Sequence, residues 1–114
     1  MIQKIDLIRE TLEQCPKLEY AEEVLYDLLE LDGSVLKEAC KRLKKINNNP
    51  FSGDVLQNKH GIDLSSCRKE YFLGTKMRIV WEPYNTTAGY VAKIWCVGLR
   101  KDQEVYQRAA SRRL

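Results

Sequence analysis

The 114-residue sequence contains one histidine and four cysteines, and the cysteines form no C-x-x-C or similar metal-ligand pair. Each cysteine falls in or beside an apolar pattern, which favours reduced, structural thiols in a cytoplasmic protein. The histidine, His60, lies in a loop ahead of the predicted sheet and is interpreted as a surface residue. The sequence therefore predicts no metal site. The four cysteines are Cys15, Cys40, Cys67 and Cys96.

Long hydrophobic runs and targeting segments are also missing. No apolar run approaches the ~20 residues that a membrane-spanning helix needs, so no membrane segment is predicted. The N-terminus alternates charged and apolar residues, unlike a secretory signal. With 44% hydrophobic and 31% charged residues and no internal repeat, residues 1–114 are predicted to form one compact domain.

The two parts of the chain carry opposite net charge. Residues 1–33 contain three basic and nine acidic side chains, a net charge of −6, so residues 34–114 carry +9 and the whole chain +3. A basic body indicates an anionic partner, with nucleic acid the obvious one, because counterions released from neutralised phosphates drive association. On charge alone, an ordinary solvated surface explains the pattern equally well.

Apolar residues recur at helical spacing in the first half of the chain. Residues 2–14 predict a short amphipathic helix that Pro16 ends. A second helix follows Pro16, and a third follows Asp32-Gly33 with Ser34 as its expected N-cap. These two helices are predicted to form an antiparallel hairpin. Their core-facing positions are Ala21, Val24, Leu25, Leu28, Leu29, Leu36, Ala39, Cys40 and Leu43.

The pattern changes to a period of two after the turn formers that follow Asn47 to Pro50. Residues 67–73, 77–84 and 90–99 predict three antiparallel strands, and the third is apolar enough to lie centrally in the sheet. Asp102 is the expected N-cap of a last helix, in which Val105 and Ala109 face inward.

An ordered set of motifs in residues 43–113 resembles the RelE/ParE superfamily of small bacterial toxins from type II toxin–antitoxin systems. The resemblance implies an α+β fold with a small antiparallel sheet, an N-terminal helical hairpin and a C-terminal helix. The motifs are Asn49-Pro50, Leu64-Ser65-Ser66-Cys67-Arg68-Lys69, Met77-Arg78-Ile79-Val80-Trp81, Val97-Gly98-Leu99-Arg100, Glu104-Val105-Tyr106, Ala109-Ala110 and Arg112-Arg113.

RelE-like members of this superfamily cleave messenger RNA without metal, usually in the ribosomal A site, whereas ParE-like members poison DNA gyrase. Arg78, Arg100 and Tyr106 fill the catalytic positions of the RelE-like branch. The resemblance therefore implies an mRNA endoribonuclease that needs no cofactor. Its expected partners are mRNA, the ribosome and a cognate antitoxin that neutralises it. The residues expected to bind RNA are Arg68, Lys69, Lys76 and Lys101. Because the hairpin lengths differ, Glu70 and Tyr71 stay open as alternatives on the first strand.

The implied chemistry is attack of a ribose 2′-hydroxyl on the adjacent phosphate, which leaves a 2′,3′-cyclic phosphate and a free 5′-hydroxyl. Arg78 would stabilise the charge that develops on the phosphorane oxygens, and Arg100 would do the same or assist the departing oxygen. Electrostatics is the expected role of both, because an arginine stays protonated at any ordinary pH. Tyr106 would position or deprotonate the 2′-hydroxyl, or stack on a base.

Each of these residues also has an ordinary structural interpretation. Arg78 can form a salt bridge with Glu82 on the strand face. Arg100 can cap the sheet edge, and Tyr106 can be a core aromatic with its hydroxyl at the surface. Two other functions stay open: a ParE-like gyrase inhibitor without nuclease activity, and a catalytically silent domain of the same fold that binds only a partner protein.

The acidic first 15 residues depart from the RelE-like pattern, in which a strand begins almost at once. Residues 17–20 are interpreted as a shortened remnant of that strand. One hypothesis is that the extra helix packs near the basic face and weakens binding of substrate or antitoxin. The plainer interpretation, which we prefer, is that it covers sheet or helix surface.

Overall fold

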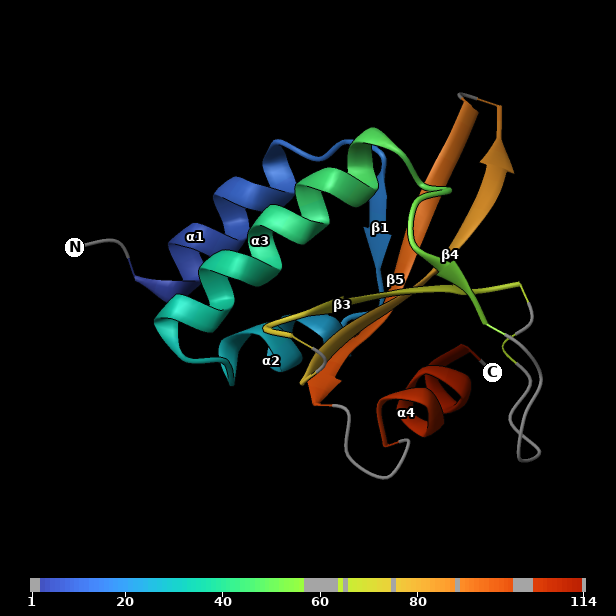
Figure 1. Ribbon diagram of the computed structural model, residues 1–114. Helices are drawn as coiled ribbons and strands as arrows, with labels where there is room; N and C mark the ends of the chain where they lie inside the picture. The colour runs from blue at the N-terminus through green and yellow to red at the C-terminus, as the bar shows by residue number, and fades with distance from the viewer. Residues whose placement is uncertain are drawn as a thin grey trace.

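The computed structural model describes residues 3–56, 64, 66–74, 76–87, 89–99 and 104–113. Within those residues the fold is α+β, as expected, and helices flank both faces of one sheet (Figure 1). The helices are α1 Lys4–Glu13, α2 Glu23–Leu29, α3 Gly33–Asn48 and α4 Glu104–Arg113. The strands are β1 Leu18–Tyr20, β2 Asp54–Val55, β3 Arg68–Phe72, β4 Met77–Thr86 and β5 Gly89–Leu99.

The sheet has the strand order β1-β5-β4-β3-β2. Its centre is the predicted set of three antiparallel strands, β3, β4 and β5, so that prediction is confirmed. Strand β5 is paired on both sides, which agrees with its nearly continuous apolar sequence. The short β1 confirms the expected remnant strand and pairs in parallel with β5, while β2 adds an antiparallel pair at the other edge.

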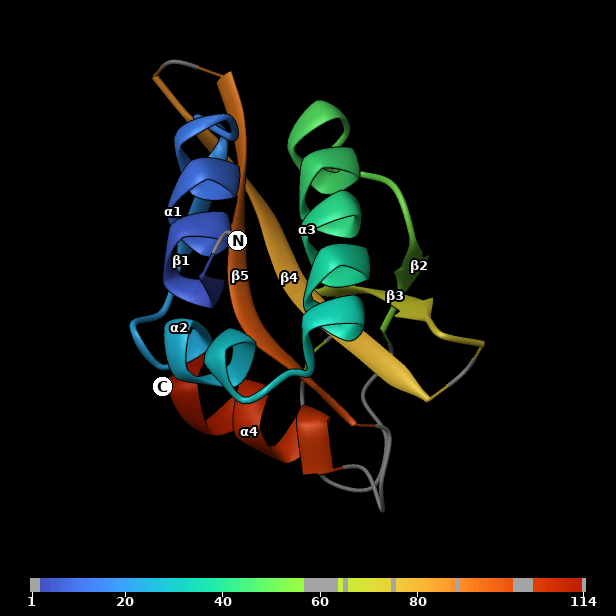
Figure 2. The same cartoon turned by 90° about the vertical axis from the view of Figure 1, so that its left-hand side faces the viewer.

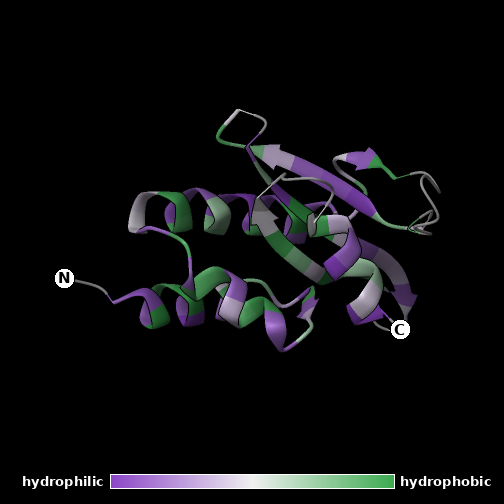
Figure 3. Ribbon diagram, turned by 90° about the horizontal axis from the view of Figure 1, so that it is seen from below, coloured by the Kyte–Doolittle hydropathy of each residue, from purple (hydrophilic) through white to green (hydrophobic). Residues whose placement is uncertain are grey.

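Helices α1, α2 and α3 cover one face of the sheet, and α4 covers the other (Figures 1 and 2). On the first face, Phe72, Ile79 and Trp81 belong to the main core with apolar residues of all three helices. Polar and hydrophobic segments alternate along α1 and α3, as expected of helices with one buried face (Figure 3). The smaller core under α4 contains Leu56, Leu64, Cys67, Val80, Cys96, Val105 and Ala109, which confirms the two inward positions predicted for this helix.

A β-bulge in β5 changes which face its side chains occupy. Val80 of β4 pairs with Cys96, but the next residue, Trp81, pairs with Ile94, so Trp95 is an extra residue in β5. The bulge interrupts the alternation of faces. As a result Trp95 and Cys96 both pack on the α4 side, and Val97 returns to the main core.

The extra N-terminal helix α1 packs along α3 and against α2 (Figure 2). Ile8 and Thr11 are its buried residues. This arrangement agrees with the plainer interpretation of the acidic segment as a cover for helix surface, because α1 lies on the opposite side of the sheet from α4.

The predicted pair of helices, α2 and α3, is present, but the start of α3 differs from the prediction. The helix begins at Gly33, and its N-cap is Asp32, which has the extended backbone that this position requires (φ −60°, ψ 155°). Ser34 therefore lies inside the first turn, and its prediction as the N-cap is wrong. The end of α3 at Asn48 agrees with the predicted Asn-Pro boundary.

The connection from α3 to β2 crosses the sheet close to Trp81. The Trp81 indole Nε1–H donates a hydrogen bond to the Pro50 carbonyl oxygen at 2.8 Å. Gly53 has a positive φ of 76°, and a Cβ atom there would lie 2.5 Å from the Lys69 carbonyl oxygen. Only glycine fits this combination of backbone angle and close approach.

Beyond the end of β1, backbone groups of β5 form hydrogen bonds with two side chains, Asp27 and Arg112. The Asp27 carboxylate of α2 accepts a hydrogen bond from the Val97 N–H at 3.1 Å. Arg112 of α4 donates to the Trp95 carbonyl oxygen at 3.0 Å. Arg112 and Asp27 also bind each other through two N···O contacts of 2.6 and 2.9 Å. The pair satisfies backbone groups that the short β1 leaves unpaired, and it fixes α4 relative to the sheet.

The substitution Asp27→Asn is expected to lower the free energy of unfolding by about 3 kcal/mol, because it removes the buried carboxylate that Arg112 binds most closely and leaves only Glu23, at 3.7 Å and half-exposed, near that charge. Urea denaturation measures this. The matched control is Asp6→Asn, since Asp6 is half-exposed and only 3.9 Å from Arg9 in a surface pair. The control should change the free energy by less than about 0.5 kcal/mol. Equal effects of the two substitutions would contradict the role assigned to Asp27.

Candidate active site

Arg78 lies between two tyrosine rings on the α4 face of the sheet. Its guanidinium carbon is 4.3 Å from the centroid of the Tyr71 ring and 4.8 Å from that of Tyr106. Tyr71 is directly opposite Arg78 in the β3–β4 register, whereas Tyr106 comes from the first turn of α4. The Arg78 side chain is only 4% exposed. A guanidinium in such cation–π contacts is held in one orientation by about 1–2 kcal/mol per ring.

Lys69 adds a second cation to this group. It lies two residues before Tyr71 on β3 and therefore on the same face of the strand. The Lys69 Nζ donates a hydrogen bond to the Tyr71 hydroxyl oxygen at 2.6 Å and is 4.9 Å from the centre of the same ring. Two cations and two phenol rings from β3, β4 and α4 thus form one cluster, which we call the Arg78 cluster: Lys69, Tyr71, Arg78 and Tyr106.

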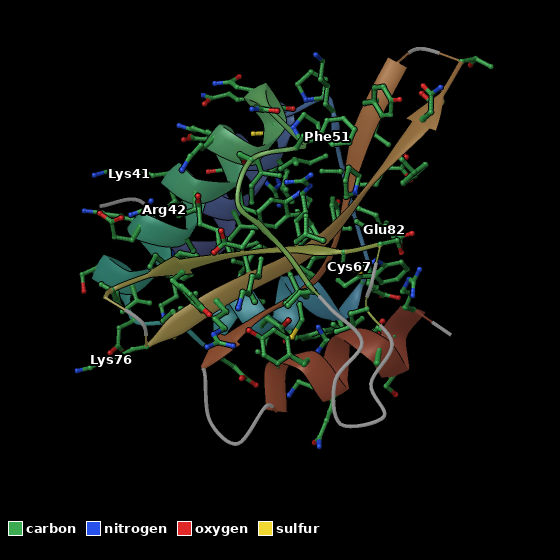
Figure 4. The ribbon with its side chains drawn as sticks, turned by 45° about the vertical axis from the view of Figure 1, so that its right-hand side comes forward. Lys41, Arg42, Phe51, Cys67, Lys76 and Glu82 are labelled. Atoms are coloured by element: carbon green, nitrogen blue, oxygen red, sulfur yellow. The ribbon has the colours of Figure 1, made fainter. Side chains whose placement is uncertain are left out.

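The other residues expected to bind RNA do not join this cluster. Arg68 occupies the opposite face of β3, where its guanidinium donates to the Phe51 carbonyl oxygen at 2.7 Å and lies 5.5 Å from the Phe51 ring. Lys76 is exposed at the β3–β4 turn and points away from the molecule (Figure 4). Arg100 and Lys101, together with the N-cap residue Asp102 expected for α4, lie outside the described residues.

The ordinary structural interpretations of Arg78 and Tyr106, a salt bridge to Glu82 and a hydroxyl at the surface, do not agree with the structure. Glu82, the expected ion-pair partner of Arg78, instead accepts a hydrogen bond from Arg113 Nε at 2.8 Å. The Tyr106 hydroxyl is buried and has no hydrogen-bond partner among the residues that the structure describes, so it is not at the surface. Arg78 and Tyr106 therefore contact each other rather than the partners that a purely structural role predicted.

Two arginines at the C-terminal end of α4 hold the helix that carries Tyr106. Arg112 binds Asp27 on one side, and the hydrogen bond that it donates to the Asp27 carboxylate raises the pKa of Arg112. Arg113 binds Glu82 on the other side, where Ser66 Oγ and Trp95 Nε1 also donate to the carboxylate at 3.2 and 3.3 Å. Arg112-Arg113 was one of the motifs of the resemblance, but no local pattern predicted its partners, because Asp27 and Glu82 are far away along the chain.

Two titratable groups beneath α4, Cys96 and Glu82, have shifted pKa values. Burial raises the pKa of the Cys96 thiol to about 12, and the neighbouring Asp27 carboxylate adds to that effect. Burial also acts against ionisation of Glu82, but the hydrogen bond and charge of Arg113, with the bonds from Trp95 and Ser66, outweigh it and lower the Glu82 pKa. All four cysteines are free and buried, in agreement with the predicted structural thiols.

The described part of the chain offers no group of three or more His, Cys, Asp or Glu side chains that could hold a metal ion. Each described helix is too short or too polar to cross a lipid bilayer. The Arg78 cluster itself supplies fixed positive charge and phenol oxygens. Such a set suits an anion, and a phosphate group in particular, because guanidinium and ammonium groups both donate to its oxygens.

The fold is that of the bacterial toxin RelE. No protein-family model and no curated protein sequence matches the chain, but solved structures do. An arginine double mutant of E. coli toxin RelE in the free state superposes with a TM-score of 0.64 at 23% identity, over 85% of this chain and 96% of that one. The isolated E. coli RelE toxin gives a TM-score of 0.58 at 22% identity, over 85% and 97% of the two chains.

A third similar structure contains a partner. The same mutant of E. coli RelE, in complex with a peptide of the antitoxin RelB, gives a TM-score of 0.57 at 22% identity over 81% of this chain and 90% of that one. Together the three likenesses confirm the α+β fold expected from the sequence motifs.

Glu82→Gln is expected to weaken the fold in a pH-dependent way. Because folding lowers the Glu82 pKa, the ionised carboxylate stabilises the protein above its ordinary pKa of 4.5, and this contribution is lost as the pH falls through the folded-state pKa. The variant should be less stable than the wild type by about 1 kcal/mol at neutral pH, after allowance for partial exposure.

Thermal or urea unfolding at a series of pH values measures this difference, which should shrink toward zero below the ordinary carboxyl pKa. Glu10→Gln, on the exposed side of α1, is the control and should give no such trend. A difference that stays constant down to acid pH would show that the charge of Glu82 is not what stabilises α4.

Proposed function

We propose that this chain is the toxin of a toxin–antitoxin pair and acts as an endoribonuclease that cleaves mRNA on the ribosome in the cytoplasm. The reaction is attack of a ribose 2′-hydroxyl on the adjacent phosphate, without a metal or other cofactor. The single observation that carries this proposal is the Arg78 cluster on a RelE fold: a buried guanidinium between two phenol rings, with an ammonium group beside it.

The role proposed for Arg78 follows from its chemistry. The phosphorane formed during the attack carries more negative charge than the phosphate, and a guanidinium donates two parallel hydrogen bonds to such oxygens. The rings of Tyr71 and Tyr106 hold the guanidinium before the substrate arrives, and the Tyr71 ring keeps it oriented during the reaction. Lys69 supplies a second positive charge for the same anion, and Arg100 is proposed to supply a third.

RNA can reach this group only if the cluster opens, because Arg78 is 4% exposed. Tyr71 is held by the β3–β4 ladder, whereas Tyr106 belongs to a helix that contacts the sheet through side chains. We therefore expect the Tyr106 side of the cluster to yield when a phosphate binds. Catalytic contacts commonly tighten only on the substrate, so the closed arrangement is compatible with activity.

The antitoxin is the proposed protein partner, as the E. coli RelE complex with an antitoxin peptide suggests. Lys76 and Lys101 are proposed as peripheral phosphate contacts, and Arg68 is the weakest of the four RNA-binding candidates because its guanidinium is engaged by the Phe51 carbonyl oxygen. A gyrase inhibitor of the same fold is the alternative function. It has no use for a cluster of oriented phosphate-binding groups, which is why the nuclease is preferred.

The test is inducible expression of the wild type and of Arg78→Ala, with growth curves and mapping of 5′-hydroxyl ends on cellular mRNA. The wild type should arrest growth and produce new mRNA ends. Arg78→Ala should lower the cleavage rate by about 100-fold to 1,000-fold, the usual cost of removing one group that stabilises a developing oxyanion.

The matched control is Arg9→Ala, because Arg9 is exposed on α1 and remote from the cluster. It should cleave like the wild type, and circular dichroism confirms that each variant is folded. Growth arrest without new mRNA ends, accompanied by loss of DNA supercoiling, would replace the nuclease by the gyrase alternative. No arrest by a soluble wild-type protein would leave a binding domain.

A further inference from the structure

The two tyrosines beside Arg78 have different surroundings at their hydroxyl groups. The Tyr71 oxygen is 2.6 Å from the ammonium nitrogen of Lys69. The Tyr106 hydroxyl is buried and has no hydrogen-bond partner among the described residues. An oxygen accepts the proton of a ribose hydroxyl more readily when a cation donates a hydrogen bond to it, and of the two tyrosines beside Arg78 it is Tyr71 that has such a bond.

We propose that Tyr71, activated by Lys69, is the general base of the reaction, and that Tyr106 acts by packing against Arg78. This inference rests on the proposed ribonuclease function. Tyr71 acts as the phenolate, and its oxygen takes the 2′-hydroxyl proton as the 2′-oxygen forms its bond to phosphorus. The bond from phosphorus to the 5′-oxygen breaks, that oxygen takes a proton from water, and Tyr71 later returns its proton to the solvent.

The hydrogen bond itself supports this assignment. An ammonium group has donors only, so the Tyr71 oxygen must accept the bond from Lys69, and the bond becomes stronger when the phenol ionises. Arg78, on the neighbouring strand, adds a second cation 4.3 Å from the ring centre. Both cations favour the phenolate over the neutral phenol. Among the described contacts, Lys69 from β3 and Arg78 from β4 face Tyr71, and Tyr106 of α4 lies on the far side of Arg78.

The backbone of β3 and its pairing with β4 bring Lys69, Tyr71 and Arg78 together. Lys69 and Tyr71 are two residues apart on β3, which directs both side chains to one face, and Tyr71 is paired directly with Arg78 across the ladder. A phosphate that binds Arg78 is therefore expected on the face of the sheet that also carries Tyr71. The alternation of faces excludes Glu70 from this role, because its carboxylate points to α3 and binds Lys45 at 2.6 Å.

Another tyrosine of the same chain shows the opposite environment. Tyr84 on β4 has a hydrogen bond to the Glu19 carboxylate, which raises its pKa to about 12. A neighbouring carboxylate thus opposes ionisation of a phenol, and a neighbouring ammonium group is expected to favour it. This contrast makes Tyr71 distinguishable by titration.

The first experiment compares single-turnover cleavage of a short mRNA on bacterial ribosomes by the wild type, Tyr71→Phe, Tyr106→Phe and Tyr26→Phe. Tyr71→Phe removes one oxygen and keeps the ring against Arg78, so RNA binding should persist while the rate falls about 100-fold or more. Tyr106→Phe should lose much less, since its ring remains. Tyr26 is 62% exposed on α2, and its variant is the matched control that should cleave normally.

The second experiment records the cleavage rate against pH for the wild type, Lys69→Met and Lys69→Arg. The wild-type rate should rise with pH and level off when Tyr71 is ionised. Lys69→Met removes the cation that favours the phenolate, so the rise should move to higher pH, and Lys69→Arg should restore most of the wild-type profile. A merely structural role of Lys69 would lower the rate at every pH without moving the rise.

The third measurement is an ultraviolet titration of the phenol groups, which needs no activity. One tyrosine should ionise ahead of the others in the wild type, and this step should vanish in Tyr71→Phe and move upward in Lys69→Met. A wild-type titration without that early step, or cleavage by Tyr71→Phe at the wild-type rate, would overturn the inference and leave the proposed ribonuclease function intact. A wild type that cuts no RNA would overturn the proposed function, and the titration would still decide whether Lys69 activates Tyr71.

Discussion

The position of helix α4, and with it the surroundings of Arg78, depends on the buried ion pair between Asp27 and Arg112. A buried carboxylate is costly unless its charge and its lone pairs are compensated. Here Asp27 accepts from both Arg112 and the Val97 N–H, and Arg112 also donates to the Trp95 carbonyl oxygen. One pair of side chains thereby joins α2, β5 and α4 where the β1 strand ends. Removing either partner would leave a backbone group of β5 unsatisfied and would take away one of the two ion pairs that hold the helix carrying Tyr106.

The sheet separates a structural face from a chemical one. Its first face is filled by aromatic and aliphatic side chains under α1, α2 and α3, and the second face carries the Arg78 cluster and α4. Because neighbouring residues of a strand point to opposite faces, Arg68 and Lys69 have different surroundings although they are adjacent. The strand that supports the core therefore also presents Lys69 and Tyr71 beside Arg78, and the rigidity of the core is passed on to the site.

Local patterns predicted most of the elements. Helical spacing indicated α1, α2 and α3, and the change to a period of two indicated the strands β3, β4 and β5. The prediction failed where a short-range signal had two acceptable sites: Asp32 and Ser34 can both cap a helix, and the extended backbone at Asp32 decided between them. The pairing of β3 with β4 could not be derived, because the length of their connecting turn sets the register and Tyr71 stayed only one alternative among several.

By itself, the sequence determined that this chain is an α+β domain with a basic body, a central antiparallel sheet and an arginine at position 78 on a strand, because hydrophobic periodicity and charge are local properties. The tertiary structure alone decided which side chains meet. Tyr71 faces Arg78 through a ladder register, Trp95 shifts the faces of β5 through a bulge, and Arg112 finds Asp27 across 85 residues of chain. Such contacts depend on the packing of elements that are distant in sequence, and no local pattern contains that information.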